Sequence, residues 1–178
     1  MALDMESEFY KLAKDILSRP KNLYKLTALG PKTSRVTVMG ADGFVMVGKS
    51  VLESFTKGPE EKAYRTGKRC GREVFGSLIR EFDEEIENLP PRKLLELGML
   101  LSSTLGWGDM KVAKLDEKAG RIVIECERTI ELGYRNSRHH RLTCGFLTGL
   151  SSVGLKREME GQVLGASEKS VTFVVEAA

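Results

Sequence analysis

The stretch PEEKAYRTGKRCGREVFGSLIREFDEE, residues 59–85, decides how this chain folds, because it carries the clearest helical pattern in the sequence. Pro59, Glu60 and Glu61 are typical of a helix start, since proline fits the first turn and carboxylates stabilise the positive end of the helix dipole. Small and apolar residues then recur every three or four positions, which predicts one buried stripe. That stripe consists of Ala63, Gly67, Cys70, Gly71, Val74, Phe75, Leu78, Ile79 and Phe82.

Three glycines, Gly67, Gly71 and Gly76, interrupt this helix. Each costs roughly 1 kcal/mol of helix stability relative to alanine, so a packing reason is expected. Gly67 and Gly71 lie one turn apart on the stripe, where the missing side chains let another backbone come close. Together with Phe75 they predict a contact surface. Its partner is either a second copy of the chain, which would make these residues a dimer seam, or another helix of the same chain.

Hydrophobic periodicity predicts the other elements as well. A hairpin is expected within residues 35–48, with its turn at Asp42-Gly43. Helices followed by paired strands around one more helix predict an α+β fold with an antiparallel sheet. Residues 1–34 are expected to form an N-terminal helix and lead-in, and residues 35–178 one compact unit. The expected helices cover about 4–18, 92–105 and 139–152, and the expected strands 110–115, 121–128, about 156–163 and 170–176.

The composition excludes several classes of protein. Hydrophobic residues make up 41% of the 178 residues and charged residues 30%, which is typical of a globular domain. No apolar stretch is long enough for a transmembrane helix, and the N-terminus does not resemble a secretory signal, so we expect a cytoplasmic protein. The three cysteines favour neither a disulfide framework nor a metal site. A net charge of +3 is mild beside the concentrated basic excess that is usual in nucleic-acid binders, and charge alone does not decide the partner.

The order of four glycine-bearing and strand motifs resembles the 4-vinyl reductase domain family. The motifs are TGKRCGREVFG (66–76), LELGMLLSSTLGWG (95–108), CGFLTGL (144–150) and the closing SVTFVVE (170–176). The resemblance covers roughly residues 35–176. It implies a fold similar to that of TRAPP subunits and of the effector-binding domains of aromatic-sensing regulators. It therefore also implies a pocket between helices and sheet, and a tendency to form homodimers.

The chain departs from the family at a zinc site that many relatives hold with a glutamate and cysteines. Alignment on Phe173 places Glu160 at the acid, but Val163 and Val171 at the two cysteines. Valine offers no ligand atom, and zinc needs about four. The resemblance therefore implies that the zinc site is absent here, and no metal is expected.

Several residues are candidates for contact with an apolar ligand. Trp107, the only tryptophan, lies between two glycines and could stack on a flat ligand, or could anchor a corner between a helix and a strand. Tyr134, Phe146 and Leu147 could line the same pocket, although aromatic and aliphatic residues more often fill the core.

Cys144 and two neighbouring histidines complete the candidate site. Cys144 is expected near the start of a helix, where a thiolate is stabilised, but a buried, unreactive thiol is the favoured interpretation. His139 and His140 belong to the basic run from Arg135 to Arg141, which could bind an anion or offer an imidazole to a ligand. A solvated loop and first helical turn is the favoured interpretation, because short charge runs usually lie on the surface.

No catalytic constellation stands out, so an enzyme is not the favoured interpretation. The segment GFVMVGKS (43–50) matches the phosphate-loop pattern in its letters, but its centre is a hydrophobic β run rather than a turning loop. No dinucleotide fingerprint is present, and no cofactor is expected. The sequence therefore predicts a module that binds a small hydrophobic or lipid-like molecule, in a sensory or carrier role with a separate output protein. The alternatives are an accessory factor in tetrapyrrole vinyl reduction and a dimeric scaffolding module.

Overall fold

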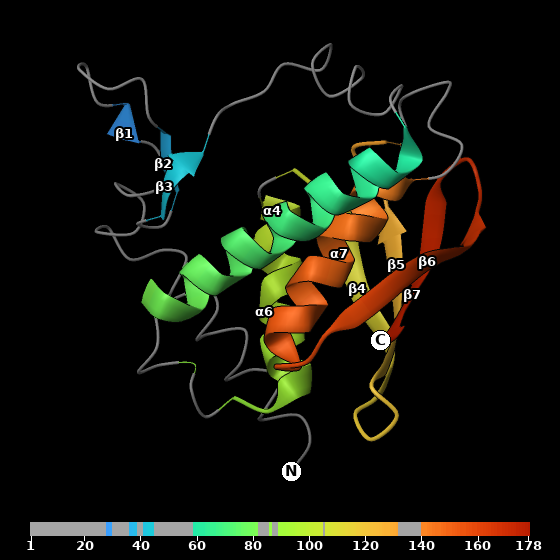
Figure 1. Ribbon diagram of the computed structural model, residues 1–178. Coiled ribbons are helices and arrows are strands. Elements are labelled where there is room, and N and C mark those ends of the chain that lie inside the picture. Colours follow the sequence, from blue (N-terminus) through green and yellow to red (C-terminus); the bar gives the residue numbers. More distant parts are fainter. Residues whose placement is uncertain are drawn as a thin grey trace.

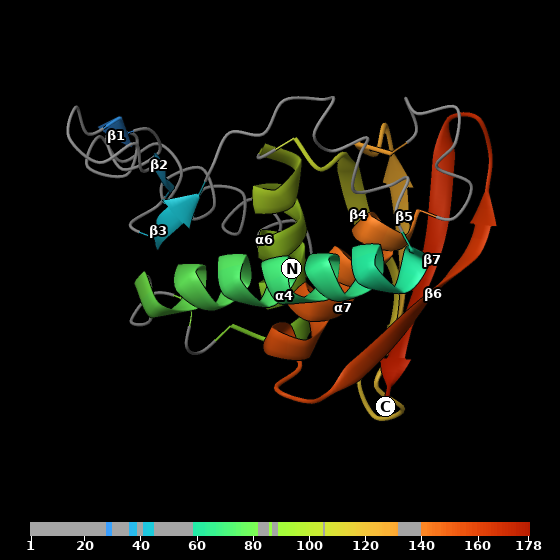
Figure 2. The same ribbon diagram turned by 45° about the horizontal axis from the view of Figure 1, so that its top comes forward.

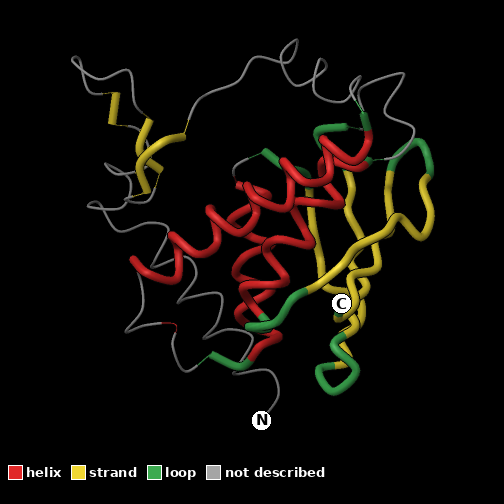
Figure 3. Tube along the Cα trace, viewed as in Figure 1, coloured by secondary structure: helices red, strands yellow, loops and turns green. Residues whose placement is uncertain are grey.

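The computed structural model describes residues 59–81, 86, 89–104, 106–131 and 140–178, together with the strands at 28–29, 36–38 and 41–44. The helix expected at 4–18, His139 and Tyr134 lie outside the described residues. In the described part the fold is α+β, with helices on one side of a four-stranded antiparallel sheet (Figures 1 and 3). The predicted fold class is therefore confirmed.

The main sheet has the strand order β4-β5-β7-β6. Two hairpins build it, and β5 and β7 join them in the middle, with Ile124 opposite Phe173. Along β5, Ile122, Ile124 and Cys126 are fully buried, which confirms the alternation predicted from the sequence. The strands are β4 (Asp109–Asp116), β5 (Arg121–Glu127), β6 (Met159–Ala166) and β7 (Ser170–Ala177).

The helices are α4 (Glu60–Glu81), α6 (Pro91–Thr104) and α7 (Arg141–Gly154). The first backbone bonds of α4 run from Lys62 and Ala63 to the Pro59 carbonyl, so the helix begins where the sequence predicts. Helix α6 ends in a glycine cap. Gly106 has φ +84°, and the amides of Gly106 and Trp107 return to carbonyls of the last turn.

Helix α4 crosses over α7, as Figures 1 and 2 both show. A Cβ on Gly67 would fall inside the Leu142 carbonyl oxygen, and one on Gly71 inside the Phe146 carbonyl oxygen. The contact is reciprocal, because Gly145 and Gly149 of α7 meet the carbonyl oxygens of Tyr64 and Lys68. The sequence allowed the backbone contact at Gly67 and Gly71 to be made either with a second copy of the chain or with another helix of the same chain. The structure makes it with α7 of the same chain.

The hydrophobic core fills the space where helices and sheet meet. Phe75 of α4 is fully buried and lies at the junction of three helices, because its ring lies within 3.0 Å of a Cβ built on Gly98 of α6 and within 3.3 Å of one built on Gly154 of α7. Burying a ring of this size is a large part of the hydrophobic stabilisation of a core.

A second, small sheet consists of β1 (Ala28–Leu29), β2 (Val36–Val38) and β3 (Ala41–Phe44). The hairpin expected here is present as the antiparallel pair β2–β3. Its turn was predicted wrongly, however. Val38 pairs with Ala41, so Asp42 and Gly43 lie within β3 rather than at the turn. Gly43 and Phe44 of the phosphate-loop match are also strand residues, and the rest of that match lies outside the described residues.

Candidate functional site

Trp107 and Phe146 form an aromatic stack at the corner between α6 and β4. Their ring centroids are 3.8 Å apart and the planes are inclined by 14°. Phe146 is fully buried, whereas Trp107 is only partly buried and packs against the core. The corner therefore has an aromatic wall with one partly accessible ring, which is suited to a flat apolar ligand.

The glycines beside Trp107 have roles within the chain. Gly106 supplies the left-handed residue that ends α6. Gly108 has φ +121°, and a Cβ on it would lie 2.9 Å from the Glu127 carbonyl oxygen and from Thr129 Cα. At Gly108 the inferred close approach is thus made by the chain's own backbone, whereas a Cβ on Gly106 would have no atom within 4 Å. This geometry explains Trp107 as a corner anchor without a ligand.

The N-terminus of α7 is capped by a carboxylate from a distant position. Glu131 is 2% exposed and accepts hydrogen bonds from the amide of Thr143 at 2.7 Å and from that of Leu142 at 3.4 Å. A carboxylate is favourable there because the first amides of a helix lack internal partners and the dipole is positive. Sequence reasoning missed Glu131, because it lies 11 and 12 residues before the amides that it accepts from and leaves no local signal.

His140 is the residue just before α7. It is 6% exposed and has a left-handed backbone with φ 43°. Non-glycine residues rarely adopt this conformation, so the chain is held in an uncommon geometry where it enters the helix. The solvated-loop interpretation therefore does not fit His140, because its side chain is buried.

Cys144, Phe146 and Leu147 are fully buried among other core side chains. Burial raises the pKa of the Cys144 thiol to about 12. The thiol is therefore protonated at neutral pH, and the structure gives it the character of a buried apolar group. Of the six predicted ligand residues, Trp107 and Phe146 lie in contact, and Tyr134 lies outside the described residues.

The zinc positions do not fit a metal. Val171 is buried in the core and Val163 packs against it, and neither offers a donor atom. Glu160 is held elsewhere, by an ion pair with Lys68 at 2.6 Å and a hydrogen bond from the Tyr64 hydroxyl at 2.7 Å. Within the described ranges, no group of three or more histidine, cysteine and acidic side chains could hold a metal ion.

Tyr64 joins the crossing of α4 and α7 to strand β6. Its hydroxyl accepts the Gly161 amide at 2.9 Å and lies 3.3 Å from the Thr148 hydroxyl. The Arg141 guanidinium lies over its ring, 4.4 Å from the centroid. Burial and the neighbouring Glu160 carboxylate raise the pKa of Tyr64. The phenol therefore stays neutral and fixes three elements together.

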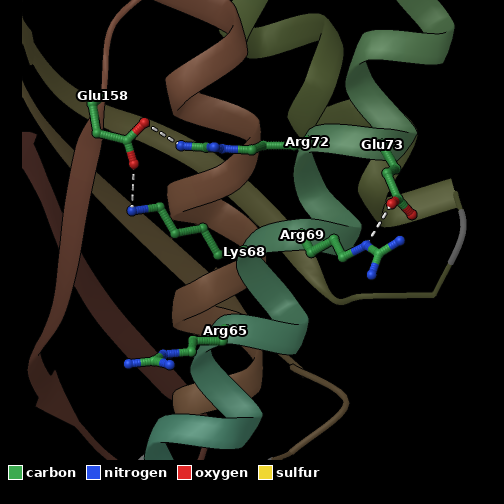
Figure 4. Close-up of a pocket in the computed structure, with 6 residues that line it drawn as sticks. All are labelled: Arg65, Lys68, Arg69, Arg72, Glu73 and Glu158. Atoms are coloured by element: carbon green, nitrogen blue, oxygen red, sulfur yellow. Dashed lines mark hydrogen bonds and ion pairs between the residues drawn. The ribbon is translucent and has the colours of Figure 1, made fainter.

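The outer face of α4 carries a second candidate site. An open groove of about 440 Å³ is lined by Arg65, Lys68, Arg69, Arg72, Glu73 and Glu158 (Figure 4). Glu158 lies between Lys68 and Arg72, and Arg69 pairs with Glu73 in the same view. Because Lys68 and Arg72 pair with it, the pKa of the Glu158 carboxyl is lowered.

Comparison with solved structures shows what this fold is similar to. The phenol-responsive sensory domain of the transcription activator PoxR, solved with phenol, superposes with a TM-score of 0.67 at 12% sequence identity. The match covers 88% of this chain and 87% of that chain, so the two share a fold.

Two variants of an H-NOX protein, one of them from T. Tengcongensis, also match. Their TM-scores are 0.46 and 0.44 at 14% and 13% identity, over 97% and 96% of this chain and 93% and 94% of theirs. No family model and no curated protein matches the chain. In the described part of the chain, no helix is long and apolar enough to cross a membrane.

Proposed function

We propose that this chain is a sensory domain that binds a small hydrophobic molecule. The observation that carries the proposal is the fold shared with the phenol-responsive sensory domain of PoxR over most of both chains. A shared fold does not by itself imply a shared function, so the proposal needs support from the residues of this chain.

That support comes from the corner beside α7. The partly buried Trp107 ring, which stacks on the fully buried Phe146 ring, offers an apolar surface. The buried Glu131 and His140 supply polar groups at the N-terminal end of the same helix. An apolar wall with few polar groups is typical of small-molecule sites. We place the ligand on the accessible part of Trp107, because Phe146 and Leu147 are already packed in the core.

A single tryptophan makes the proposal directly testable by fluorescence. Phenol, as the first probe, and larger aromatic compounds are titrated into the purified chain while Trp107 emission is recorded. Saturable quenching or a spectral shift is expected, and Trp107→Leu should weaken binding measured by calorimetry. A matched control is Leu164→Ala, which removes an exposed apolar side chain on β6. Absence of any saturable response across the aromatic series would overturn the proposal.

Native mass spectrometry on freshly purified protein distinguishes the alternatives. An apolar mass released on unfolding supports the sensory or carrier role and gives the ligand class. A ligand-free dimer would favour the scaffolding module, and a bound tetrapyrrole would favour an accessory role in vinyl reduction. Membership of the 4-vinyl reductase family, the cytoplasmic location and a separate output protein stay predictions, and so does the homodimer, which the same samples test.

A further inference from the structure

The groove on the outer face of α4 is a cationic site apart from the Trp107 corner. Arg65, Lys68, Arg69 and Arg72 follow the spacing i, i+3, i+4 and i+7, so one helix face presents all four. From Arg65 to Arg72 the helix rises about 10 Å. The lining residues comprise four cations and two carboxylates, and two further carboxylates, Glu61 and Glu160, pair with Arg65 and Lys68 from beside the groove.

The four cations are held with different strength. Lys68 is only 14% exposed; it donates to the Met159 carbonyl at 2.7 Å and pairs with Glu158 and Glu160. The same Glu158 pairs with Arg72, so these two cations form a fixed wall against β6. Figure 4 shows both side chains directed toward Glu158.

Arg65 and Arg69 are the exchangeable members. Their side chains are 78% and 82% exposed, and the ion pairs described for them are with Glu61 and Glu73 of the same helix. Exposed ion pairs of this kind contribute little to the stability of the fold, because water screens the charges and the long side chains lose entropy when they pair. Both guanidinium groups can therefore turn to an incoming anion at small cost.

We propose that this groove binds a small molecule carrying two or more phosphate groups. Arginine supplies three of the four cations, and its planar fork matches phosphate oxygens in a bidentate manner. A single carboxylate cannot reach cations spread over about 10 Å, whereas adjacent phosphates can meet different arginines. The volume of about 440 Å³ lies within the range of small-molecule sites.

The carboxylates of Glu73 and Glu158 favour a small ligand over an anionic polymer. They lie on the two sides of the cationic stripe, so an acidic protein segment or a nucleic acid laid across the stripe would face them. This inference goes beyond the proposed sensory role and does not depend on it, since the two sites share no residue.

The test is isothermal calorimetry with pyrophosphate and ATP at low salt. Arg65→Ala/Arg69→Ala is expected to weaken binding of both compounds at least about tenfold, which corresponds to the loss of one or two charge-assisted hydrogen bonds. The matched control is Lys111→Ala/Arg121→Ala, which removes the same charge from exposed positions on the sheet. The control should change affinity less than about twofold, because any remaining effect is long-range and screened.

Three results would overturn the inference. The first is that neither compound binds the wild-type chain at low salt. The second is that the control variant loses as much affinity as the groove variant. The third is that an oligoglutamate peptide binds more tightly than pyrophosphate, which would make the groove a protein-docking surface. Far-UV circular dichroism verifies that both variants are folded. Phenol titration of the groove variant, read from Trp107, should remain like wild type and separates this inference from the proposed function.

Discussion

The inner and outer faces of α4 differ in how they are stabilised. On the inner face, Gly67 and Gly71 bring backbone against backbone, with no side chain to adjust. On the outer face, Arg65 and Arg69 hold exposed ion pairs within the helix. Close packing makes the first face intolerant of a single added methyl group, whereas solvent screening makes the second nearly indifferent to losing a charge. One helix thus combines a fixed structural contact with an exposed surface of screened ion pairs.

The largest expected effect comes from adding a methyl group to the inner face. Gly71→Ala should lower the free energy of unfolding by about 3 kcal/mol or more, because the new Cβ falls inside the Phe146 carbonyl oxygen and lies 2.9 Å from the Leu150 amide. Urea denaturation followed by circular dichroism measures the loss.

Gly76→Ala is the matched control on the same helix. The nearest atom to its Cβ is the end of the Arg80 side chain at 3.5 Å. The substitution should therefore stabilise the protein by up to about 1 kcal/mol through helix propensity alone. Equal effects of the two substitutions would contradict the contrast between the faces.

Tyr64 lies where the two faces meet, and Tyr64→Phe should have the next largest effect. Loss of the hydroxyl leaves the Gly161 amide without this acceptor and removes a bond to the Glu160 carboxylate. We expect a loss of about 2 kcal/mol in the free energy of unfolding. Ser77→Ala removes an exposed α4 hydroxyl that accepts from Arg80, and it should cost less than about 0.5 kcal/mol. A loss for Tyr64→Phe as small as this would show that the network contributes no stability.

The buried side of α7 should respond to pH through Cys144, whose pKa is raised to about 12 by burial. The thiol ionises at a lower pH in the unfolded chain, with a pKa of about 8.5, than in the folded one. Its contribution to stability is therefore complete below that pH and decreases as the pH rises toward 12. Between pH 9 and 11, the stability difference between wild type and Cys144→Ala should shrink by about 1.4 kcal/mol per pH unit. A difference that is constant with pH would show that the thiol ionises equally in both states.

The smallest effect is expected on the outer face. Arg69→Ala removes an ion pair whose partners are 82% and 62% exposed. The free energy of unfolding should change by less than about 0.5 kcal/mol, and less still at high salt. Denaturation at two salt concentrations measures this. A decrease in the free energy of unfolding as large as that for Tyr64→Phe would show that the outer face also stabilises the fold.

Short-range patterns were sufficient to predict helices α4, α6 and α7 and the four strands of the main sheet. The stripe of α4, the Gly106 cap of α6 and the alternation of β5 all depend on residues within a few positions of one another. The turn was predicted wrongly at Asp42-Gly43. The local preference of this residue pair for a turn is weaker than the pairing of β2 with β3, which places both residues in β3.

The candidate site was predicted less completely. Trp107 and Phe146 were both singled out, yet their stacking depends on how α7 is placed beside the corner after α6. Cys144 was assigned two possible characters, and only the surrounding core decides between them, since burial raises its pKa. The groove on α4 was not foreseen, because Glu158, which lines it, lies more than eighty residues from the cations in the sequence.

By itself the sequence determined helices α4, α6 and α7, the four strands of the main sheet and the α+β class, and it indicated that a backbone approaches Gly67 and Gly71. The reason is that periodicity, capping and missing side chains act locally. Only the tertiary structure decided that this backbone belongs to α7, that Glu131 caps that helix and that Glu158 lines the groove on α4. Such pairings join positions far apart in the chain, and they are set by the packing of the whole core rather than by any local preference.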